Sequence, residues 1–467
     1  MSLLNENENP IVKRIAVLCK MSLCSPALIG SGEDEYTDRD VYVDFEGNPI
    51  IPGTTLAGVL RNTLSSVDAD VLFGKLINSS EDSKVNKTSP LWVFDAPLWR
   101  GETKENAEII TIDNVSLDEN QRNVPEHKRT QSPELDHMHK VAVSGGKFDF
   151  QAVERGSCFD LRLQLIIRKN DTKCKDGQMP IYLLEKVFDS LLEKLNVLYV
   201  GGKTSRGFGK LECSEIYKKV FENTPEWLEN WIGFDWHDEE KLGLKSFKII
   251  PPKLPDNNGT ICATLELDGT LLIRDDYSVI GDEDAAHITS DGLPVIYGTS
   301  WAGAIRSGLA RFLKTHKYNR CEAYLDEVFG CSKDDDTKAS MIRIDASYFE
   351  SDKRHSFTRV KIDRWTGGAT KRALFTTCPQ FGGTVKLNIH YPAGDDAIRQ
   401  LFILSLQAID LGIITVGGET SIGRGKFKVK EICINGEGKD KKALFKEEKP
   451  QLKLKLSPEP EGGATHG

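Results

Sequence analysis

The hydrophobic and polar positions of this chain follow one order of patterns, and that order occurs twice. Each occurrence opens with a strand-like run, residues 11–30 or 261–281. In the second run Ala263, Leu265 and Leu267 alternate with polar residues, which is typical of a half-buried strand. Apolar residues at helical spacing follow, at residues 54–64 or 299–313, and a threonine that can cap a helix precedes each set.

A second helical pattern comes late in each occurrence, at residues 182–195 and 396–412, and a glycine-rich segment follows it. The two segments read VGGKTSRGFGKLE from Val200 and VGGETSIGRGKFK from Val416, and eight of their first eleven positions are identical. Each runs into a last strand-like stretch. This order of elements, with an antiparallel sheet, predicts an α+β fold of two tandem ferredoxin-like units, the architecture of RNA-recognition modules.

Two further motif pairs indicate an internal duplication. IPGTTLAGVLRNTL from Ile51 resembles IYGTSWAGAIRSGL from Ile296, and each is followed by Phe-Gly, a polar loop and a short strand with Asp-Ala. The predicted domains are residues 1–240 and 259–438, joined by a linker at 241–258. Residues 439–467 are charged and rich in Pro and Gly, so we expect a mobile C-terminal tail there.

Composition narrows the class of protein. With 467 residues, 39% of them hydrophobic, the chain is long enough for two or three globular domains. It has no apolar run of about 20 residues and no signal or transit pattern at its start, which excludes a membrane span and a membrane partner. The ten cysteines are scattered without a CxxC pair, which favours reduced thiols in a cytoplasmic protein.

The net charge of −9 argues against a protein that coats nucleic acid by bulk attraction. A local basic segment exists nonetheless, because residues 351–372 hold seven Lys or Arg against two acids. The sequence therefore leaves room for a basic groove on an acidic protein.

The glycine segments match neither common phosphate-binding loop. They lack the Walker A pattern, and they follow a helix and precede a strand, the reverse of a dinucleotide site. One interpretation is a turn that permits close backbone contact. The other is a row of backbone N–H groups, with nearby cations, that lies along an RNA backbone. The candidate RNA-binding residues here are Gly201, Gly202, Lys203, Arg206, Gly417, Gly418 and Arg424.

The starts of the first helices are a second candidate site. Gly53 and Thr54, or Thr299, leave backbone N–H groups at a helix start, which suits a phosphate. Arg61 and Arg306 lie one to two turns further on and could clamp that phosphate with two hydrogen bonds. An ordinary capped helix with a solvated arginine is the alternative.

The ordered set of motifs, present twice between about residue 11 and 435, resembles the RAMP superfamily of CRISPR systems. It is most similar to the backbone subunits of type III effector complexes. The resemblance implies a tandem fusion that occupies two adjacent positions along a guide RNA. It also implies three kinds of partner: guide RNA, single-stranded target RNA, and the neighbouring backbone, small and large subunits of the complex.

In that family a thumb hairpin from each backbone unit displaces a nucleotide of the guide–target duplex. The segment from Lys361 to Phe375 resembles this thumb in the second unit. Arg359, Arg364 and Trp365 are candidate RNA contacts there, because cations track phosphates and aromatic rings stack on bases. The thumb of the first unit is expected near residues 101–150, where the first unit carries about 29 extra residues.

The family also cuts target RNA with a loop aspartate and a divalent cation. Spacing from the Pro-Gly motif places Asp38 at that position, with Asp40 as the near alternative and Arg39 able to orient a phosphate. The same count in the second unit gives Glu283, flanked by Asp282 and Asp284. Such carboxylates suit Mg²⁺, although a solvated acidic loop is the alternative.

A zinc ion is a second metal to consider, with His137 and His139 as its ligands, although their spacing is not that of a zinc finger. The default interpretation is that these are surface histidines.

The sequence is consistent with three alternative functions. The first is a guide-binding subunit that also cleaves paired target RNA, whose sequence is read by base pairing. The second is the same subunit as a scaffold without catalysis. The third is a guide-processing endoribonuclease, which usually employs a histidine near the first helix. No histidine occurs from Met1 to Glu126, which weighs against the third.

Overall fold

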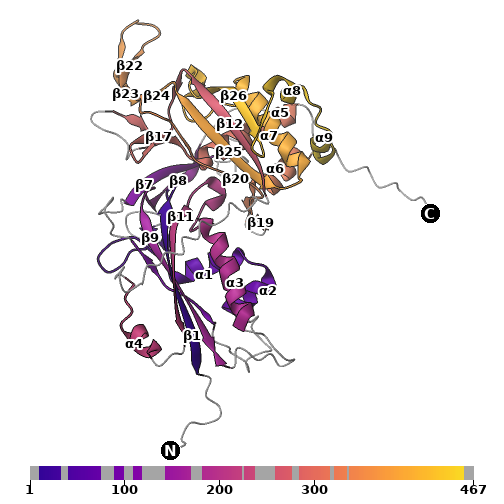
Figure 1. Cartoon of the computed structure of the whole chain (residues 1–467). Helices are drawn as coiled ribbons and strands as arrows, with labels where there is room; N and C mark the ends of the chain where they lie inside the picture. Colours follow the sequence, from indigo (N-terminus) through magenta and orange to yellow (C-terminus); the bar gives the residue numbers. More distant parts are fainter. Residues whose placement is uncertain are drawn as a thin grey trace, which may run out of the picture.

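The computed structural model describes residues 10–32, 40–74, 89–98, 109–117, 142–169, 181–222, 226–236, 258–275, 283–315, 320–333 and 336–456. They form two units in sequence order, which lie one above the other in Figure 1. The first unit comprises the described residues up to 236, and the second unit begins at 258. No helix among the described residues is long and apolar enough to cross a membrane.

The sheet of the first unit has five antiparallel strands in the order β10-β11-β1-β9-β5. Without β10 this is the strand order 4-1-3-2 of a ferredoxin-like fold. Its strands are β1 (Ile11–Leu23), β5 (Leu91–Val93), β9 (Cys158–Arg168), β10 (Val197–Tyr199) and β11 (Lys210–Glu222). Its helices are α1 (Gly53–Asn62), α2 (Ser66–Phe73) and α3 (Ile181–Glu193).

The second unit repeats the arrangement with the order β20-β25-β12-β26-β27. Here β26-β12-β25-β20 is again the order 4-1-3-2, so the predicted fold class is confirmed. The strands are β12 (Asn258–Asp268), β20 (Arg343–Ile344), β25 (Thr384–Pro392), β26 (Lys426–Ile434) and β27 (Glu437–Lys439). The helices are α5 (Gly298–Thr315), α6 (Cys321–Phe329) and α7 (Asp396–Asp410).

The duplication extends to irregularities of the backbone. The pairing of β1 with β11 shifts register between Lys20 and Met21, and that of β12 with β26 shifts between Thr264 and Leu265. These bulges stand at equivalent positions of the two units. A β-bulge bends its strand and increases the local twist. The two units therefore share this local backbone geometry as well as the repeated sequence motifs.

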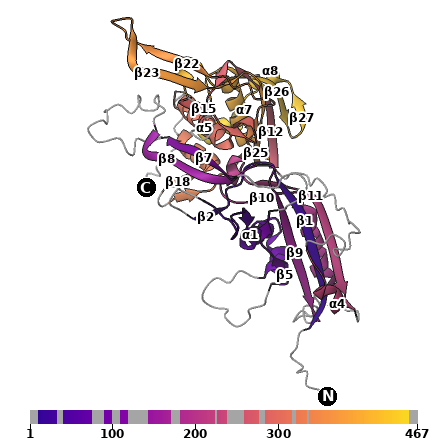
Figure 2. The same ribbon diagram turned by 90° about the vertical axis from the view of Figure 1, so that its left-hand side faces the viewer.

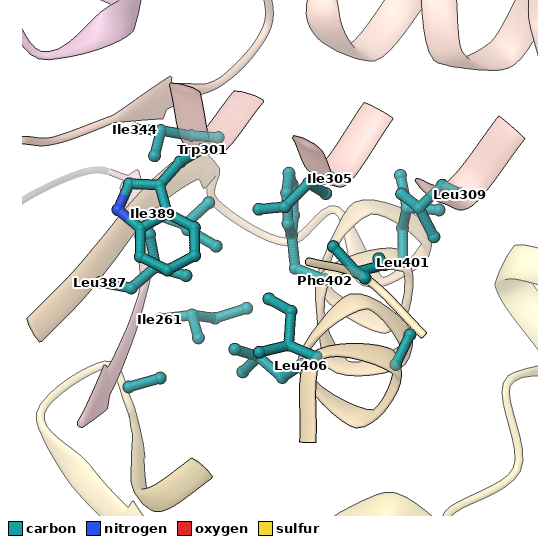
Figure 3. Packing of buried hydrophobic residues seen from close by; sticks show 14 of the residues in the cluster. Ile261, Trp301, Ile305, Leu309, Ile344, Leu387, Ile389, Leu401, Phe402 and Leu406 are labelled. Atoms are coloured by element: carbon teal, nitrogen blue, oxygen red, sulfur yellow. The ribbon is translucent and has the colours of Figure 1, made fainter. Parts of the chain in front are cut away.

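Each unit has its own core between its sheet and its helices. In the second unit, Trp301 and Ile305 of α5 pack with Phe402 and Leu406 of α7 against the sheet residue Leu387 (Figure 3). A separate cluster of the first unit joins β1, β9 and α3. Helical and strand periodicity thus buries one face of each element, as the patterns predicted.

Short elements complete both units. They are β2 (Gly30–Gly32), β3 (Asp40–Val41), β4 (Ile50–Ile51), β6 (Ala96–Pro97), β13 (Thr270–Leu271), β14 (Arg274–Asp275), β15 (Ala285–His287), β16 (Thr289–Ser290), β17 (Leu293–Ile296), β18 (Cys331–Lys333), β19 (Asp336–Lys338), β21 (Ser347–Tyr348), β24 (Gln380–Phe381) and α4 (Trp227–Ile232).

Two hairpins project toward the same side of the molecule in both views (Figures 1 and 2). The hairpin of the second unit pairs β22 (Phe357–Ile362) with β23 (Ala369–Cys378), at the place predicted for the thumb. The hairpin of the first unit pairs β7 (Ile109–Leu117) with β8 (Ala142–Val153). The residues between β7 and β8 lie outside the described part.

The region after residue 439 differs from the predicted mobile tail. It forms α8 (Lys441–Lys446) and α9 (Pro450–Leu456), in which Leu444, Leu452 and Leu456 are buried. The Leu452 N–H donates to Gln400 Oε1 of α7 at 3.0 Å. The high content of charged residues predicted a tail without structure, and this prediction was wrong. Three widely spaced leucines are buried there and hold the two short helices against α7. Residues 457–467 lie outside the described part.

The first helix also starts differently from the prediction. Helix α1 begins at Gly53, and Thr54 is an exposed residue inside it, so Thr54 is not the cap. The Gly53 N–H donates to Asp95 Oδ1 at 2.6 Å. The aspartate of the Asp-Ala motif therefore satisfies a free N–H of the helix start, which links two of the repeated motifs.

Candidate nucleic-acid interface

The two glycine loops have the same backbone. Gly201 and Gly417 have φ values of 78° and 81°, and the non-glycine residues Lys203 and Glu419 have 56° and 53°. A Cβ on Gly209 would lie 1.9 Å from the Val200 carbonyl oxygen, and one on Gly425 would lie 1.9 Å from that of Val416. These glycines are therefore required by a tight turn, which supports the first interpretation of the motif.

The loop of the first unit packs against the second unit. A Cβ on Gly207 would lie 2.7 Å from Ala346 N, and one on Gly298 would lie 2.3 Å from Arg206 O. The Arg206 guanidinium donates to Phe329 O at 2.7 Å, and burial lowers its pKa. Arg206 thus has a structural partner in the second unit, and its RNA contact stays a prediction. Lys203 Nζ lies 3.9 Å from the centre of the Phe150 ring.

The loop of the second unit carries a cluster of charges instead. Arg274 Nη2 and Arg359 Nη2 contact the two oxygens of Glu419 at 2.9 and 2.6 Å, and Arg424 Nε lies 3.4 Å from one of them. Burial alone would raise the pKa of Glu419, but hydrogen bonds from Arg359 and Arg274 outweigh it and lower that pKa. We call Arg274, Arg359, Arg424 and Glu419 the arginine cluster.

Arg424 is the buried member of this cluster. It is 2% exposed, and its Nη2 donates to Thr377 Oγ1 at 3.2 Å. Its Nη1 has no hydrogen-bond partner among the described residues. Three guanidinium groups thus face one carboxylate, and one buried N–H donor group is left over. An additional anion would satisfy both the surplus positive charge and the unused donors.

The thumb hairpin lies beside the arginine cluster, since Arg359 is in β22 and Thr377 in β23. Its tip is a turn in which Asp363 Oδ1 accepts from the N–H groups of Trp365 and Thr366 at 3.0 and 2.8 Å. These hydrogen bonds lower the pKa of Asp363. The turn presents Trp365 with 91% of its surface exposed, and Arg364 is exposed beside it. The hairpin therefore offers a free aromatic ring and cations together.

The candidate catalytic acids fall partly outside the described residues. Asp38, Arg39 and Asp282 lie there, and Asp40 is described only as the first residue of β3. Glu283 Oε1 accepts from Ser356 Oγ at 2.5 Å, while its Oε2 is buried without a partner in the described part. Asp284 Oδ2 accepts from the Thr376 N–H at 2.7 Å. Both acids therefore sit at the base of the thumb.

The residues present fit a hydrated divalent cation better than a fully enclosed one. The free Oε2 of Glu283 is one oxygen ligand, and Mg²⁺ often takes only one or two carboxylates, with water and phosphate as its other ligands. Among the described residues there is no group of three His, Cys, Asp or Glu that could hold a metal. His137 and His139 lie outside the described part, so the zinc site stays a prediction.

The helix-start arginines have the same internal role in both units. Arg61 Nη2 contacts Asp70 of α2, and Arg306 Nη2 contacts Asp326 of α6, each at 2.5 Å. Arg61 also donates to Gly74 O at 2.8 Å. These contacts tie the first helix of each unit to the next one. The phosphate clamp stays a prediction that would require these guanidinium groups to serve two partners.

Each of the two units has a ferredoxin-like fold, the architecture that RNA-recognition modules also have. The model of one protein family, the RAMP superfamily, matches this chain twice, at residues 20–212 and 264–428. These matches cover more than half of the chain, and the protein belongs to the RAMP superfamily. The two matches correspond to the two units, so the chain is a tandem RAMP protein.

The other comparisons add less. No curated protein matches. Among solved structures, a chain of "Cryo-EM structure of the Type III-B Cmr-beta bound to cognate target RNA" is similar at 13% identity. The match covers 42% of this protein and 96% of that chain, with a TM-score of 0.30.

The motif comparison overlooked three members of the candidate site: Arg274, Thr377 and Glu419. The sequence contains a signal for Glu419, because aligning the two glycine loops shows Lys203 replaced by Glu419 and Phe208 by Arg424. A charge reversal and a buried aromatic replaced by arginine, within an otherwise identical motif, indicate different neighbours.

Proposed function

We propose that this protein is a fused backbone subunit of a type III CRISPR effector complex and that it binds guide RNA along both units. The family and the tandem arrangement support the class. The arginine cluster of the second unit is the observation that carries RNA binding. It lies between the glycine loop and the thumb, has two more guanidinium groups than carboxylates, and includes a buried donor that lacks a partner in the described part.

The chemistry of this place suits a polyanion better than a base-specific contact. Guanidinium groups bind phosphate oxygens with paired hydrogen bonds, and contacts to phosphate carry no sequence information. The exposed Trp365 of the neighbouring hairpin suits stacking, which tolerates any base. Phosphate contact plus stacking gives binding independent of sequence, as a guide-holding subunit requires.

Changing the two more exposed arginines of the cluster tests RNA binding. We expect Arg274→Gln together with Arg359→Gln to weaken binding of a guide-length single-stranded RNA by about tenfold or more. Each lost phosphate contact also lowers the salt dependence, by about 0.7 in the slope of log affinity against log salt. Glu419→Gln should strengthen binding, because it removes the competing carboxylate. Fluorescence anisotropy at several salt concentrations measures both quantities.

Arg399 supplies the matched control. It lies on α7 and pairs with Asp396 and Glu447, away from the hairpin. Arg399→Gln removes one positive charge, as each of the two cluster substitutions does, and it should leave affinity and slope as they are. Equal effects of the cluster variants and this control, or an unchanged slope, would show that the cluster does not hold phosphate.

A second function, cleavage of guide-paired target RNA, is favoured by the position of Glu283. Its unpartnered oxygen lies at the base of the hairpin that we propose to displace a nucleotide. A divalent cation there would offset charge on the scissile phosphate. Glu283 and Asp284 would hold or orient that ion in the second unit, and Asp38 or Asp40 in the first.

Cleavage by the assembled complex separates the cutting subunit from the scaffold. We expect Glu283→Gln and Asp38→Asn each to abolish cutting at one set of positions in the target while guide binding is retained. Chelation of divalent ions should abolish both sets. If the target is cut as before in the double variant, the subunit is a scaffold and another component cuts.

A further inference from the structure

Two cysteines meet between the first and the last strand of the first sheet. Cys19 belongs to β1 and Cys213 to β11, 194 positions later, and both are free thiols in the structure. Their Sγ atoms lie 2.7 Å apart. A disulfide bond is about 2.05 Å long, so the two sulfur atoms would have to approach by only roughly 0.7 Å to form one.

The β-bulge of the first unit explains this short distance. Across the two strands Cys213 pairs with Met21, so Cys19 is its diagonal neighbour. In a regular antiparallel pair the Cα atoms of diagonal neighbours are about 7 to 8 Å apart, beyond the usual range of a disulfide. Here Ser214 is the extra residue of the register shift, and a bulge bends its strand. The bulge therefore turns Cys213 toward Cys19.

The two thiols differ in their access to water. Cys19 is fully buried, and its Sγ donates to Met21 Sδ at 3.2 Å. Burial, and then the contact with Cys213, raise the pKa of the Cys19 thiol well above its usual value. Cys213 is half-buried and packs at the margin of the core of the first unit. A dissolved oxidant therefore reaches Cys213 first, while Cys19 waits behind it as a protonated thiol.

The second unit has the same bulge without the sulfur atoms. Aligning the two bulges places Ala263 at the position of Cys19 and Val429 at the position of Cys213. Both residues are buried in the core of the second unit. Small apolar side chains therefore fill these two positions, and the packing of the fold does not require a pair of thiols there.

We propose that Cys19 and Cys213 form a redox-active dithiol, which hydrogen peroxide converts to a disulfide between β1 and β11. The Cys213 thiolate attacks one peroxide oxygen, so an S–O bond forms, the O–O bond breaks, and the leaving hydroxide takes up the proton that Cys213 released. The Cys19 sulfur then attacks the sulfenic acid of Cys213. The S–S bond forms, the S–O bond breaks, and the second hydroxide takes the Cys19 proton. Two thiols and one peroxide thus become one disulfide and two waters.

The disulfide would make the first unit more stable. It joins two residues 194 positions apart, and a cross-link that closes a long loop restricts the unfolded chain. The thermal midpoint of the first unit should therefore rise by about 5 °C or more on oxidation, and a thiol reductant should reverse the rise. The pair includes none of the residues proposed to contact RNA, so the inference is independent of the proposed function.

Peptide mapping of the full-length protein tests the proposal. The reduced protein is treated with hydrogen peroxide, its remaining thiols are alkylated with N-ethylmaleimide, and it is digested without reduction. Mass spectrometry should find the peptides of Cys19 and Cys213 linked to each other, with neither cysteine alkylated. Treatment with dithiothreitol before alkylation should restore both thiols. Thermal unfolding of the reduced and the oxidised protein measures the change in midpoint.

Cys19→Ala and Cys213→Val give the first unit the residues of the second and are the matched variants. Cys19→Ala should leave Cys213 as a sulfenic acid that dimedone traps, and Cys213→Val should leave Cys19 as a thiol and abolish the rise in midpoint. If the buried Cys19→Ala fails to fold, the half-buried Cys213→Val still tests the link. Peroxide that leaves Cys19 and Cys213 unlinked in the native protein overturns the proposal. So does a disulfide confined to Cys262 and Cys433, which face each other across β12 and β26.

Discussion

The two glycine loops have the same backbone conformation, but the other unit covers the first loop and the second loop is exposed. Gly207 is buried against the backbone of Asp345 and Ala346, while Gly423, with a φ of 94°, is exposed. Both loops close on their own strand through the same hydrogen bond, from Val200 N to Gly209 O at 2.9 Å and from Val416 N to Gly425 O at 3.0 Å. Contacts within each unit therefore determine the backbone conformation of the motif. The neighbours of each loop determine what its surface residues contact.

Side chains show the same division. Phe208 packs edge to face on Phe150 in the first unit, with ring centres 5.7 Å apart. At the equivalent positions of the second unit Arg424 donates to Thr377. An aromatic pair suits a surface covered by protein, and a buried arginine with a spare donor suits a surface that meets an anion. One duplicated motif has thus become a protein contact in one unit and a charged site in the other.

The largest expected effect comes from adding one methyl group at equivalent glycines. Gly207→Ala combines a positive φ with overlap of the Ala346 backbone, so we expect it to lower the free energy of unfolding by about 2 to 4 kcal/mol. Gly423→Ala meets only the φ penalty and should cost about 1 kcal/mol. Urea unfolding of both variants measures the difference.

Gly209→Ala and Gly425→Ala are the matched controls, because each adds a Cβ 1.9 Å from a carbonyl oxygen of its own loop. They should destabilise to a similar extent. If Gly207→Ala and Gly423→Ala are equally mild, the first loop is not held against the second unit as described.

The repeated motifs were sufficient to predict the fold class and the two units, and the family resemblance predicted the place of the β22–β23 hairpin in the second unit. They succeed because strand alternation, helix spacing and glycine turns are local properties of the sequence. The contact of Glu154 with Ser290 was not predictable in the same way, since the two residues are 136 positions apart and neither belongs to a repeated motif. The 96% exposure of the Phe45 side chain was not predictable either, because it depends on how the folded chain packs around the turn that carries it.

The candidate site was predicted in part for the same reason. Arg359 and Arg424 were chosen as cations near recognised motifs, and the structure brings both to Glu419. Glu419 itself was treated as a variable position of a glycine loop, although it organises the cluster. Arg206 was chosen by the same local rule, but its partner Phe329 is 123 residues away. Local patterns identify candidate residues, while the partners depend on tertiary packing.

The two units differ in a titratable group at one pair of equivalent positions, which gives a pH-dependent effect of intermediate size. His287 of the second unit is fully buried, and the equivalent Tyr42 is 44% exposed. Burial, and then the nearby charge of Arg354, lower the pKa of His287 to about 3. The unfolded chain binds this proton at a pKa of about 6.5 and the folded chain does not, so stability falls as pH drops below about 6.5. At pH 5 this loss is about 2 kcal/mol.

Comparing the native protein with His287→Asn isolates this contribution. His287 Nδ1 accepts from the Ile273 N–H at 3.0 Å, and the Asn side-chain oxygen keeps an acceptor without a proton to titrate. The difference in unfolding free energy between the two proteins should change by about 2 kcal/mol from pH 7 to pH 5. A difference that does not vary with pH would mean that His287 is accessible to protons in the folded protein. Tyr42→Asn should show no such dependence.

The smallest expected effect comes from exchanging the equivalent side chains Arg206 and Ile422 between the covered loop and the exposed loop. Arg206→Ile places the residue of the second loop in the first, and it removes the hydrogen bond to Phe329 O that crosses between the units. Leaving that carbonyl without its donor should cost about 1 kcal/mol. The repulsion between Arg206 and Arg306, which helps to lower the pKa of Arg206, disappears at the same time and keeps the loss small. Ile422→Arg, at a position 57% exposed, should change stability by less than about 0.5 kcal/mol. If Arg206→Ile and Ile422→Arg change the free energy of unfolding equally, contact with the second unit does not explain why the first loop has an arginine at position 206.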